Sequence, residues 1–256
     1  MEKARRICMM TLFCYILIWL DLFGCAIMHN QQKVLESSYT STNKTELSNF
    51  VFLIKQFHTT IPDPWCLDDC ETEILLSSAS GSVLTNDKSS IYVLTAAHFC
   101  VDDENFTSFF KEDIEILGFT GPRSRRMEIF AVDNINDICL LKGPKFTDEK
   151  YKNIKIAKNV PKIGERVINI AAPHGVAGPQ IRLLFDGHFG GCDDTCVFTV
   201  PASFGSSGSA IYNEDGELVT ILVAVLHDFK NVSLGPTNKQ IWDFILSVDE
   251  LVDIYE

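Results

Sequence analysis

Three residues whose side chains could act together in catalysis each stand at the edge of an apolar run. Ser207 lies in the glycine-rich segment FGSSGSA, and a serine hydroxyl becomes an effective nucleophile only when a base removes its proton. His98 ends the run IYVLTAAH and could be that base, while Asp137 begins the run DICLL and could orient the imidazole. The order histidine, aspartate, serine at the mouths of separate strands therefore predicts an acyl-transfer site.

The glycines beside Ser207 predict an oxyanion hole. Gly205 and Gly208 permit backbone conformations that other residues avoid. Such a turn could direct the N–H groups of Gly205 and Ser207 to one point, where they would bind a developing negative oxygen. The competing histidines, His174 in APHG and His188 in DGHF, stand in turn-like settings and are predicted to be exposed loop residues.

These segments resemble the signatures of the trypsin/chymotrypsin-like serine peptidases. The matching segments are LTAAH, DICLL and GSSGSA, in that order, and the resemblance covers roughly residues 75–246. It implies an all-β fold of two six-stranded Greek-key β-barrels with a C-terminal helix, and catalytic groups in the cleft between the barrels. It also implies that Ser207 attacks an acyl carbon, that His98 transfers the proton, and that Asp137 holds the imidazole. No cofactor and no metal are expected.

Departures from the family pattern predict how this chain differs. Ser206 stands before the nucleophile, where zymogen-type trypsins carry an aspartate, so activity is expected without an activating cut. The catalytic residues are separated by 39 (137 − 98) and 70 (207 − 137) positions, which resembles compact bacterial and phage-type members. No carboxylate stands at the positions aligned with the specificity pocket, so a small or apolar substrate side chain is expected. The predicted substrate-binding residues are Pro201, Val223, Ala224, Val225 and Gly235.

The nine cysteines allow more than one interpretation. Two pairs share one spacing, Cys66 with Cys70 and Cys192 with Cys196, and in an oxidising compartment each predicts a local disulfide. The alternative is one zinc site that joins both pairs, since four cysteines at this spacing suit zinc. Cys139 lies within an apolar strand and is predicted to be a buried free thiol. The partner of Cys100 is left open.

The N-terminus is predicted to be an export signal. A positive segment precedes the apolar stretch 7–20, which is short for a membrane span. LFGC at 22–25 resembles a lipoprotein cleavage box that ends in Cys25, and cleavage after Ala26 or an uncleaved membrane anchor are alternatives. A net charge of −12 without a basic stripe argues against a nucleic-acid partner.

The remaining chain divides into a tether and a domain. The leader is assigned to residues 1–28, a polar tether with a short helix to 29–60, and the peptidase domain to 61–256. Apolar residues at three- and four-residue steps predict that helix over 46–57. Many short apolar runs with turn signals between them follow from Ile74 and indicate an all-β sandwich or a pair of barrels. Thr237 or Asn238 is predicted to cap a last helix.

Together these features predict an exported serine endopeptidase that acts on polypeptides and is secreted, periplasmic or anchored through its leader. The alternative is a catalytically idle relative that uses the cleft to bind a partner. An esterase with the same three residues is a third interpretation.

Overall fold

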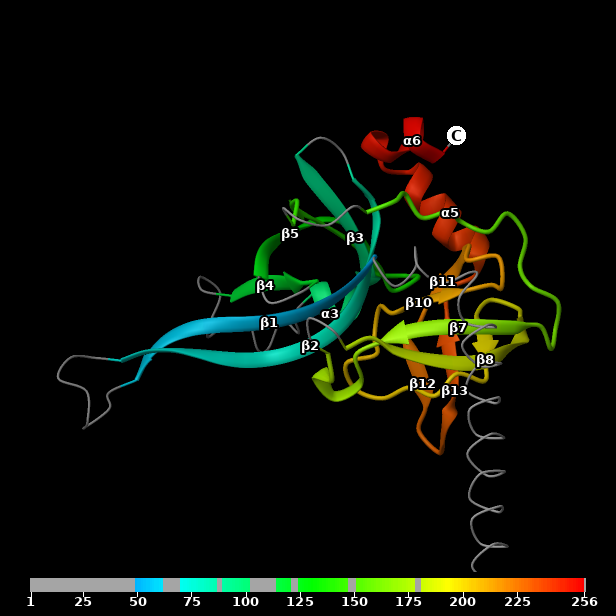
Figure 1. The fold of residues 1–256 in the computed structure, drawn as a ribbon, viewed down its shortest axis with the longest axis horizontal. Coiled ribbons are helices and arrows are strands. Elements are labelled where there is room, and N and C mark those ends of the chain that lie inside the picture. The colour runs from blue at the N-terminus through cyan, green and yellow to red at the C-terminus, as the bar shows by residue number, and fades with distance from the viewer. Residues whose placement is uncertain are drawn as a thin grey trace, which may run out of the picture. The chain divides into compact units, whose positions relative to one another are not determined.

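The described residues fold mainly into two β-sheets, and strands of both sheets contribute side chains to one shared core (Figure 1). All described residues belong to one unit, Thr45–Glu256. The computed structural model describes residues 49–61, 70–86, 89–101, 114–120, 124–146, 151–177 and 181–255.

The first sheet is a closed barrel with the strand order β1-β2-β3-β6-β5-β4. All of its pairings are antiparallel. Its strands are β1 (Phe50–Ile61), β2 (Cys70–Asn86), β3 (Ser90–Ala96), β4 (Ile114–Phe119), β5 (Ser124–Asp133) and β6 (Ile138–Pro144).

The centre of strand β3, residues 91–94, is apolar because both faces of the strand are buried. Ile91 and Val93 point into the barrel, whereas Tyr92 and Leu94 join a second core that also contains residues of the other sheet. Strand β6 pairs with β3 along its whole length and alternates in the same way. The two strands that lead to His98 and from Asp137 are therefore fixed from both sides.

The predicted helix over 46–57 is wrong, because residues 50–61 form β1. Along β1, Val51 and Leu53 face the barrel interior while Phe50 packs into the core between the sheets. With both faces buried, the strand lacks the polar and apolar alternation that normally reveals one. Even Lys55 and Gln56 are buried, and the barrel thus includes residues before position 61.

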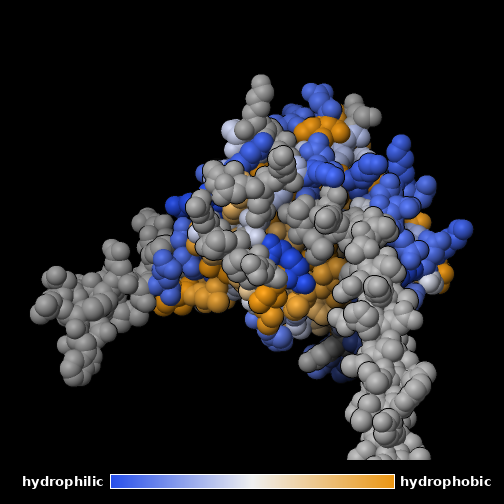
Figure 2. Space-filling view, viewed as in Figure 1, coloured by the Kyte–Doolittle hydropathy of each residue, from blue (hydrophilic) through white to orange (hydrophobic). Residues whose placement is uncertain are grey.

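The hairpin of β1 and β2 extends beyond the barrel (Figure 1). Strand β4 pairs with β1 only up to Phe57, so among the described strands the rest of β1 pairs with β2 alone. Figure 2 shows apolar side chains gathered along this hairpin and a more hydrophilic surface over the C-terminal helices. Within β2, Ile74 and Leu75 are exposed.

The second sheet has the order β11-β10-β7-β8-β9-β13-β12. Its end strands β11 and β12 are consecutive in the chain and meet at a bend. Before the bend, Leu222 N donates to Ser209 O at 2.8 Å; after it, Val223 N donates to Leu234 O at 2.9 Å. Its strands are β7 (Arg166–Ala171), β8 (Leu183–Cys192), β9 (Cys196–Phe198), β10 (Ala210–Tyr212), β11 (Leu218–Ile221), β12 (Ala224–Leu226) and β13 (Phe229–Gly235).

The sequence predicts six strands for this barrel, whereas the structure has seven. The bend explains the difference, because β11 and β12, at the two ends of the strand order, can be counted as one strand that bends at residues 222 and 223. The predicted all-β, chymotrypsin-like fold class is confirmed.

The predicted C-terminal helix is present as α5 (Asn238–Leu246). Thr237 accepts a hydrogen bond from Gln240 N at 3.2 Å, and the Gln240 side chain accepts one from Thr237 N at 2.6 Å, which completes a capping box. A second helix, α6 (Asp249–Tyr255), follows. None of the helices in the described ranges has the length and apolar character needed to cross a membrane.

Candidate active site

His98 lies on a single helical turn, α3 (Ala97–Cys100), directly after β3. Two hydrogen bonds tie this turn to Asp137, the residue just before β6: Ala97 N donates to Asp137 O at 3.2 Å, and His98 N donates to the side-chain Oδ1 of Asp137 at 2.8 Å. The His98 side chain is 48 % exposed, so its ring is open to an incoming molecule.

The imidazole and the Asp137 carboxylate are in direct contact, with Nδ1 2.7 Å from Oδ2. A carboxylate oxygen can only accept, so the proton of a neutral imidazole lies on Nδ1. This leaves Nε2 free of a proton and able to act as a base. The structure thus brings together two of the three residues singled out in the sequence.

Asp137 takes its position from the turn between β5 and β6. Its φ is +57°, a left-handed conformation that Asp tolerates better than most residues. The turn is held by Asp133, which accepts hydrogen bonds from Ile135 N, Asn136 N and Asn136 Nδ2. Burial opposes ionisation of Asp133, but the bonds from Asn136 and Ile135 outweigh it and hold the pKa of Asp133 below its usual range.

Ser207 lies in the loop between β9 and β10, and this loop is seated on the first barrel. Ser80 N donates to Ser207 O at 2.8 Å. Gly208, with φ +80°, lies so close to Thr95 Oγ1 and Ser80 O that any Cβ there would collide with both. The nucleophile loop therefore contacts the end of β3 that leads into His98. Among the described residues, however, the hydrogen bonds of the site do not include one from Ser207 Oγ to the imidazole, a bond that is often long before substrate binds.

The backbone around Gly205 forms a tight turn that has no room for a side chain at this position. Gly205 has φ +89°, and a Cβ there would lie 2.5 Å from Ala172 O. His174 N donates to Phe204 O at 2.6 Å. Because the peptide bond is trans, the N–H of Gly205 points to the side opposite Phe204 O, away from that turn. Within the described part of the chain, neither Gly205 N nor Ser207 N donates to a protein acceptor.

The predicted substrate-pairing segment lies at an edge of the second sheet. Strand β12 pairs only with β13 among the described strands, and its residues Ala224 and Leu226 are exposed. The other predicted pocket residues differ in setting. Pro201 is half-buried in the nucleophile loop, and Gly235 packs closely against Ile221 O and Thr220.

The structure adds two residues that the sequence did not single out at this site. Phe204 is 88 % exposed and makes an edge-on ring contact with His174, whose own exposure was expected. Ser233, opposite Val225 in the β12–β13 pair, is fully buried, and its hydroxyl has no hydrogen-bond partner among the described residues. A lone serine inside a strand and a phenylalanine inside a loop give no signal in the sequence.

The predicted free thiol at Cys139 is wrong, because Cys139 forms a disulfide with Cys100. Register explains the pairing: Thr95 lies opposite Cys139, and α3 contacts β6 just beyond that point. This bridge lies two residues beyond His98 and Asp137 and joins the same two segments. Both cysteines are buried.

The two cysteines of the second sheet form the predicted local disulfide. Cys192 and Cys196 form a disulfide with each other, so their thiols are not available to the alternative zinc site. The prediction for the other pair includes Cys66, which lies outside the described residues.

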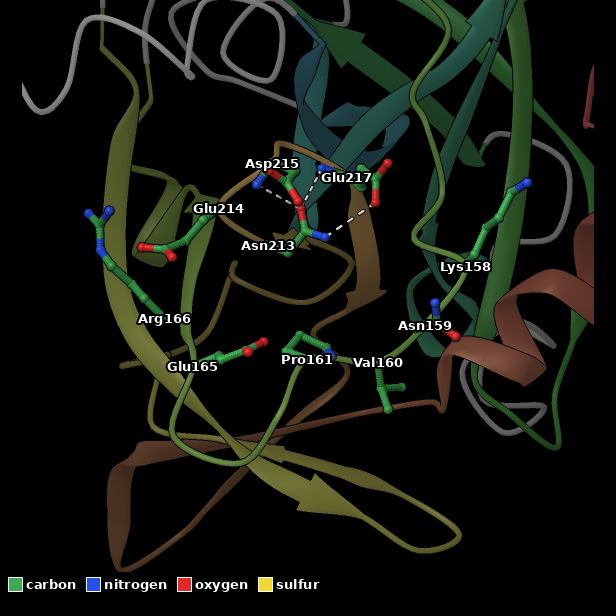
Figure 3. Close-up of a pocket in the computed structure, with 10 residues that line it drawn as sticks. All are labelled: Lys158, Asn159, Val160, Pro161, Glu165, Arg166, Asn213, Glu214, Asp215 and Glu217. Carbon is green, nitrogen blue, oxygen red and sulfur yellow. Dashed lines mark hydrogen bonds between the residues drawn. The ribbon is translucent and has the colours of Figure 1, made fainter.

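A separate hollow of about 450 Å³ lies on the second sheet (Figure 3). Figure 3 shows it between the segment 158–166 and the turn 213–217, where Asn213 bonds Asp215 and Glu217. None of the candidate catalytic residues lines it, and its charged groups carry both signs. We therefore do not assign the reaction to this hollow.

Comparison with known proteins identifies the class. The family of trypsin-like peptidase domains matches residues 79–221, more than half of the chain, and the protein belongs to this family. A sequence search of curated proteins finds no match.

Solved serine proteases share the fold. The inactive form of a serine-to-alanine mutant of Rv3671c from M. tuberculosis aligns with a TM-score of 0.59 at 12% identity and covers 84% of this chain and 93% of that one. A serine endoprotease from Yersinia pestis aligns with a TM-score of 0.58 at 17% identity and covers 81% of this chain and 65% of that one. The active form of the Rv3671c protease gives 0.57 at 14% identity, with coverage of 80% and 82%.

Proposed function

We propose that this trypsin-like protein is an exported serine endopeptidase in which Ser207, His98 and Asp137 form the catalytic triad. The observation that carries the proposal is the 2.7 Å contact between His98 Nδ1 and Asp137 Oδ2, beside a glycine-flanked serine loop seated on the same strand end. This contact orients the imidazole so that Nε2 can accept the serine proton.

The proposed reaction gives one role to each of these groups. Ser207 Oγ attacks the scissile carbonyl carbon as His98 Nε2 takes its proton, and the Asp137 carboxylate stabilises the imidazolium. The carbonyl oxygen becomes negative and is bound by the N–H groups of Gly205 and Ser207. His98 then gives the proton to the leaving amine as the C–N bond breaks, and water releases the acyl group by the same steps in reverse.

The substrate is proposed to be an extended polypeptide with a small or apolar side chain at the cleavage site. Among the described strands, β12 pairs only with β13, so its other edge can offer backbone hydrogen-bonding groups to an extended substrate. Val223, Ala224 and Val225 are the proposed contacts. Pro201 and Gly235 complete the proposed pocket, whose positions carry no carboxylate for a basic side chain.

Export is proposed from the leader sequence and the disulfides. Two disulfides in the described residues, Cys100–Cys139 and Cys192–Cys196, fit an oxidising compartment better than a reducing one. Membrane attachment through the leader is part of the same proposal.

Labelling by a fluorophosphonate probe tests the proposal directly, because the probe reacts with a serine hydroxyl only when a base activates it. We expect one probe to bind per chain, with a peptide map that places it on Ser207, and cleavage of an unstructured protein such as casein that the probe abolishes. A folded protein that neither labels nor cleaves would instead support a binding module built on the same fold.

The second prediction concerns processing. Ser206 is buried, and its hydroxyl accepts a bond from Ser203 N at 3.3 Å, so the loop is closed by its own residues. We therefore expect residues 46–256 with a blocked N-terminus to be as active as a sample cut upstream of Ile74. Activity that appears only after such a cut creates a new N-terminus would contradict this prediction.

A further inference from the structure

Ser80, in the middle of β2, is the one described residue of the first barrel whose side chain bonds both the nucleophile loop and the neighbouring turn of the second sheet. It is fully buried. Its hydroxyl donates to Gly205 O at 2.8 Å and accepts from Ala172 N at 2.9 Å. These partners lie 125 and 92 residues away along the chain, so a single hydroxyl joins three distant segments.

The bond to Gly205 acts on the peptide units that form the proposed oxyanion hole. Two carbonyls flank the Gly205 Cα. Phe204 O is held by His174 N at 2.6 Å, and Gly205 O is held by the Ser80 hydroxyl. With both carbonyls fixed, the peptide that carries the Gly205 N–H cannot rotate without breaking one of the two bonds.

The second bond of Ser80 reinforces the first. Ala172 N, which donates to the Ser80 hydroxyl, begins the turn η1 (Pro173–Gly175) that supplies the His174 N–H. Within this turn His174 is left-handed, with φ +53°, and Gly175 N donates back to Ala172 O at 3.0 Å. The hydroxyl therefore holds Gly205 directly and also holds the turn that fixes Phe204.

The backbone of Ser80 makes separate bonds. Its N–H donates to Ser207 O at 2.8 Å, and its carbonyl accepts from Thr95 Oγ1 at 2.8 Å. These bonds do not involve the hydroxyl, so a change to alanine removes only the contacts to Gly205 and Ala172. The position of the loop on the barrel and the effect of the hydroxyl on the oxyanion hole can thus be separated.

We propose that Ser80 is a positioning residue that orients the Gly205 N–H for the transition state across the junction of the two sheets. This inference rests on the proposed function, because it requires a reaction that develops an oxyanion. It differs from a merely structural role, in which the buried hydroxyl would contribute to stability but not to the binding of that oxygen.

The test compares Ser80→Ala with Ser82→Ala. Ser82 is buried on the same strand, and its hydroxyl accepts a bond from Tyr212 OH at 3.3 Å instead of bonding the nucleophile loop. We expect Ser80→Ala to lower kcat about 10- to 100-fold with little change in KM, because only the transition state carries the oxyanion. Affinity for a peptide aldehyde, which forms a tetrahedral adduct with the nucleophile, is expected to fall by the same factor as kcat/KM.

Ser82→Ala should keep kcat and aldehyde affinity within about threefold of the original values. It should lower the melting temperature by about as much as Ser80→Ala does. If the original protein is active and Ser80→Ala matches Ser82→Ala in kcat and aldehyde affinity, Ser80 is merely structural and the inference fails. If the original protein neither hydrolyses peptides nor binds the aldehyde, the proposed function fails and this inference fails with it. Faster amide exchange of residues 203–208 in Ser80→Ala alone is the expected structural sign.

Discussion

Ser207→Ala is expected to abolish hydrolysis, with a loss in kcat on the order of 10⁶-fold, as for removal of the nucleophile in a related mechanism. The neighbouring serines of the loop, Ser206 and Ser209, are fully buried and so are not expected to replace Ser207 as the nucleophile. The sulfur atoms nearest to His98 and Asp137 in the chain, those of Cys100 and Cys139, are joined in a buried disulfide. Fluorophosphonate labelling should disappear along with turnover.

The same variant should fold normally. The Ser207 hydroxyl makes no hydrogen bond among the described residues, so its loss should change the free energy of unfolding by no more than about 1 kcal/mol. Ser203→Ala is a matched control, since its hydroxyl in the same loop is also without a bond within the described residues. It should keep both turnover and labelling. Turnover in Ser207→Ala close to that of Ser203→Ala would remove Ser207 from the mechanism.

The local parts of the site could be predicted because each lies in a short, informative segment. His98 follows a strand that is apolar on both faces, and Asp137 precedes its neighbour in the barrel. Once β3 and β6 pair, the ends that carry these residues necessarily meet. The glycines around Ser207 likewise indicate a turn that few other residues allow, and Gly205 and Gly208 both have positive φ.

Contacts between residues far apart in the chain could not be predicted, because they depend on which strands pair and in what register. Strand β1 was predicted as a helix because burial on both faces removes its alternation. Cys139 was predicted as a free thiol because only the register of β3 and β6 shows that Cys100 lies near it. The partners of Ser80 are equally distant in the chain, and a serine inside a strand resembles any other polar residue.

Asp137→Asn is the second change with a large expected effect. The new side chain matches the original in shape, and asparagine tolerates the left-handed φ of +57° at this position, whereas alanine would add strain. The fold should therefore persist. Any loss of activity can then be assigned to the imidazole and not to the turn that carries it.

The direction of the effect follows from the two bonds of the carboxylate. Oδ1 accepts from His98 N, a donor that cannot change, so in the variant the amide oxygen of the new side chain must take that place. The amide nitrogen then faces Nδ1, which must become an acceptor, and the imidazole proton moves to Nε2. In this tautomer His98 cannot accept the proton of Ser207, and we expect kcat to fall about 10⁴-fold with KM little changed.

Two measurements check this account of Asp137→Asn. Nitrogen chemical shifts of His98 should show the proton on Nδ1 in the original protein and on Nε2 in the variant. The second measurement is kcat, compared with that of Asp133→Asn as the matched control. Asp133 is a neighbouring carboxylate that holds the same turn, and its hydrogen bonds run to Ile135 and Asn136 instead of the imidazole.

We expect Asp133→Asn to retain activity within about tenfold and to lower stability, since the hydrogen bonds that depress the pKa of Asp133 favour its charged form. The loss of kcat in Asp137→Asn should exceed that of the control by several hundredfold or more, because only Asp137 fixes the tautomer of the base. If Asp137→Asn instead loses no more activity than Asp133→Asn, or keeps the proton on Nδ1, Asp137 does not orient the base and the proposed triad is wrong.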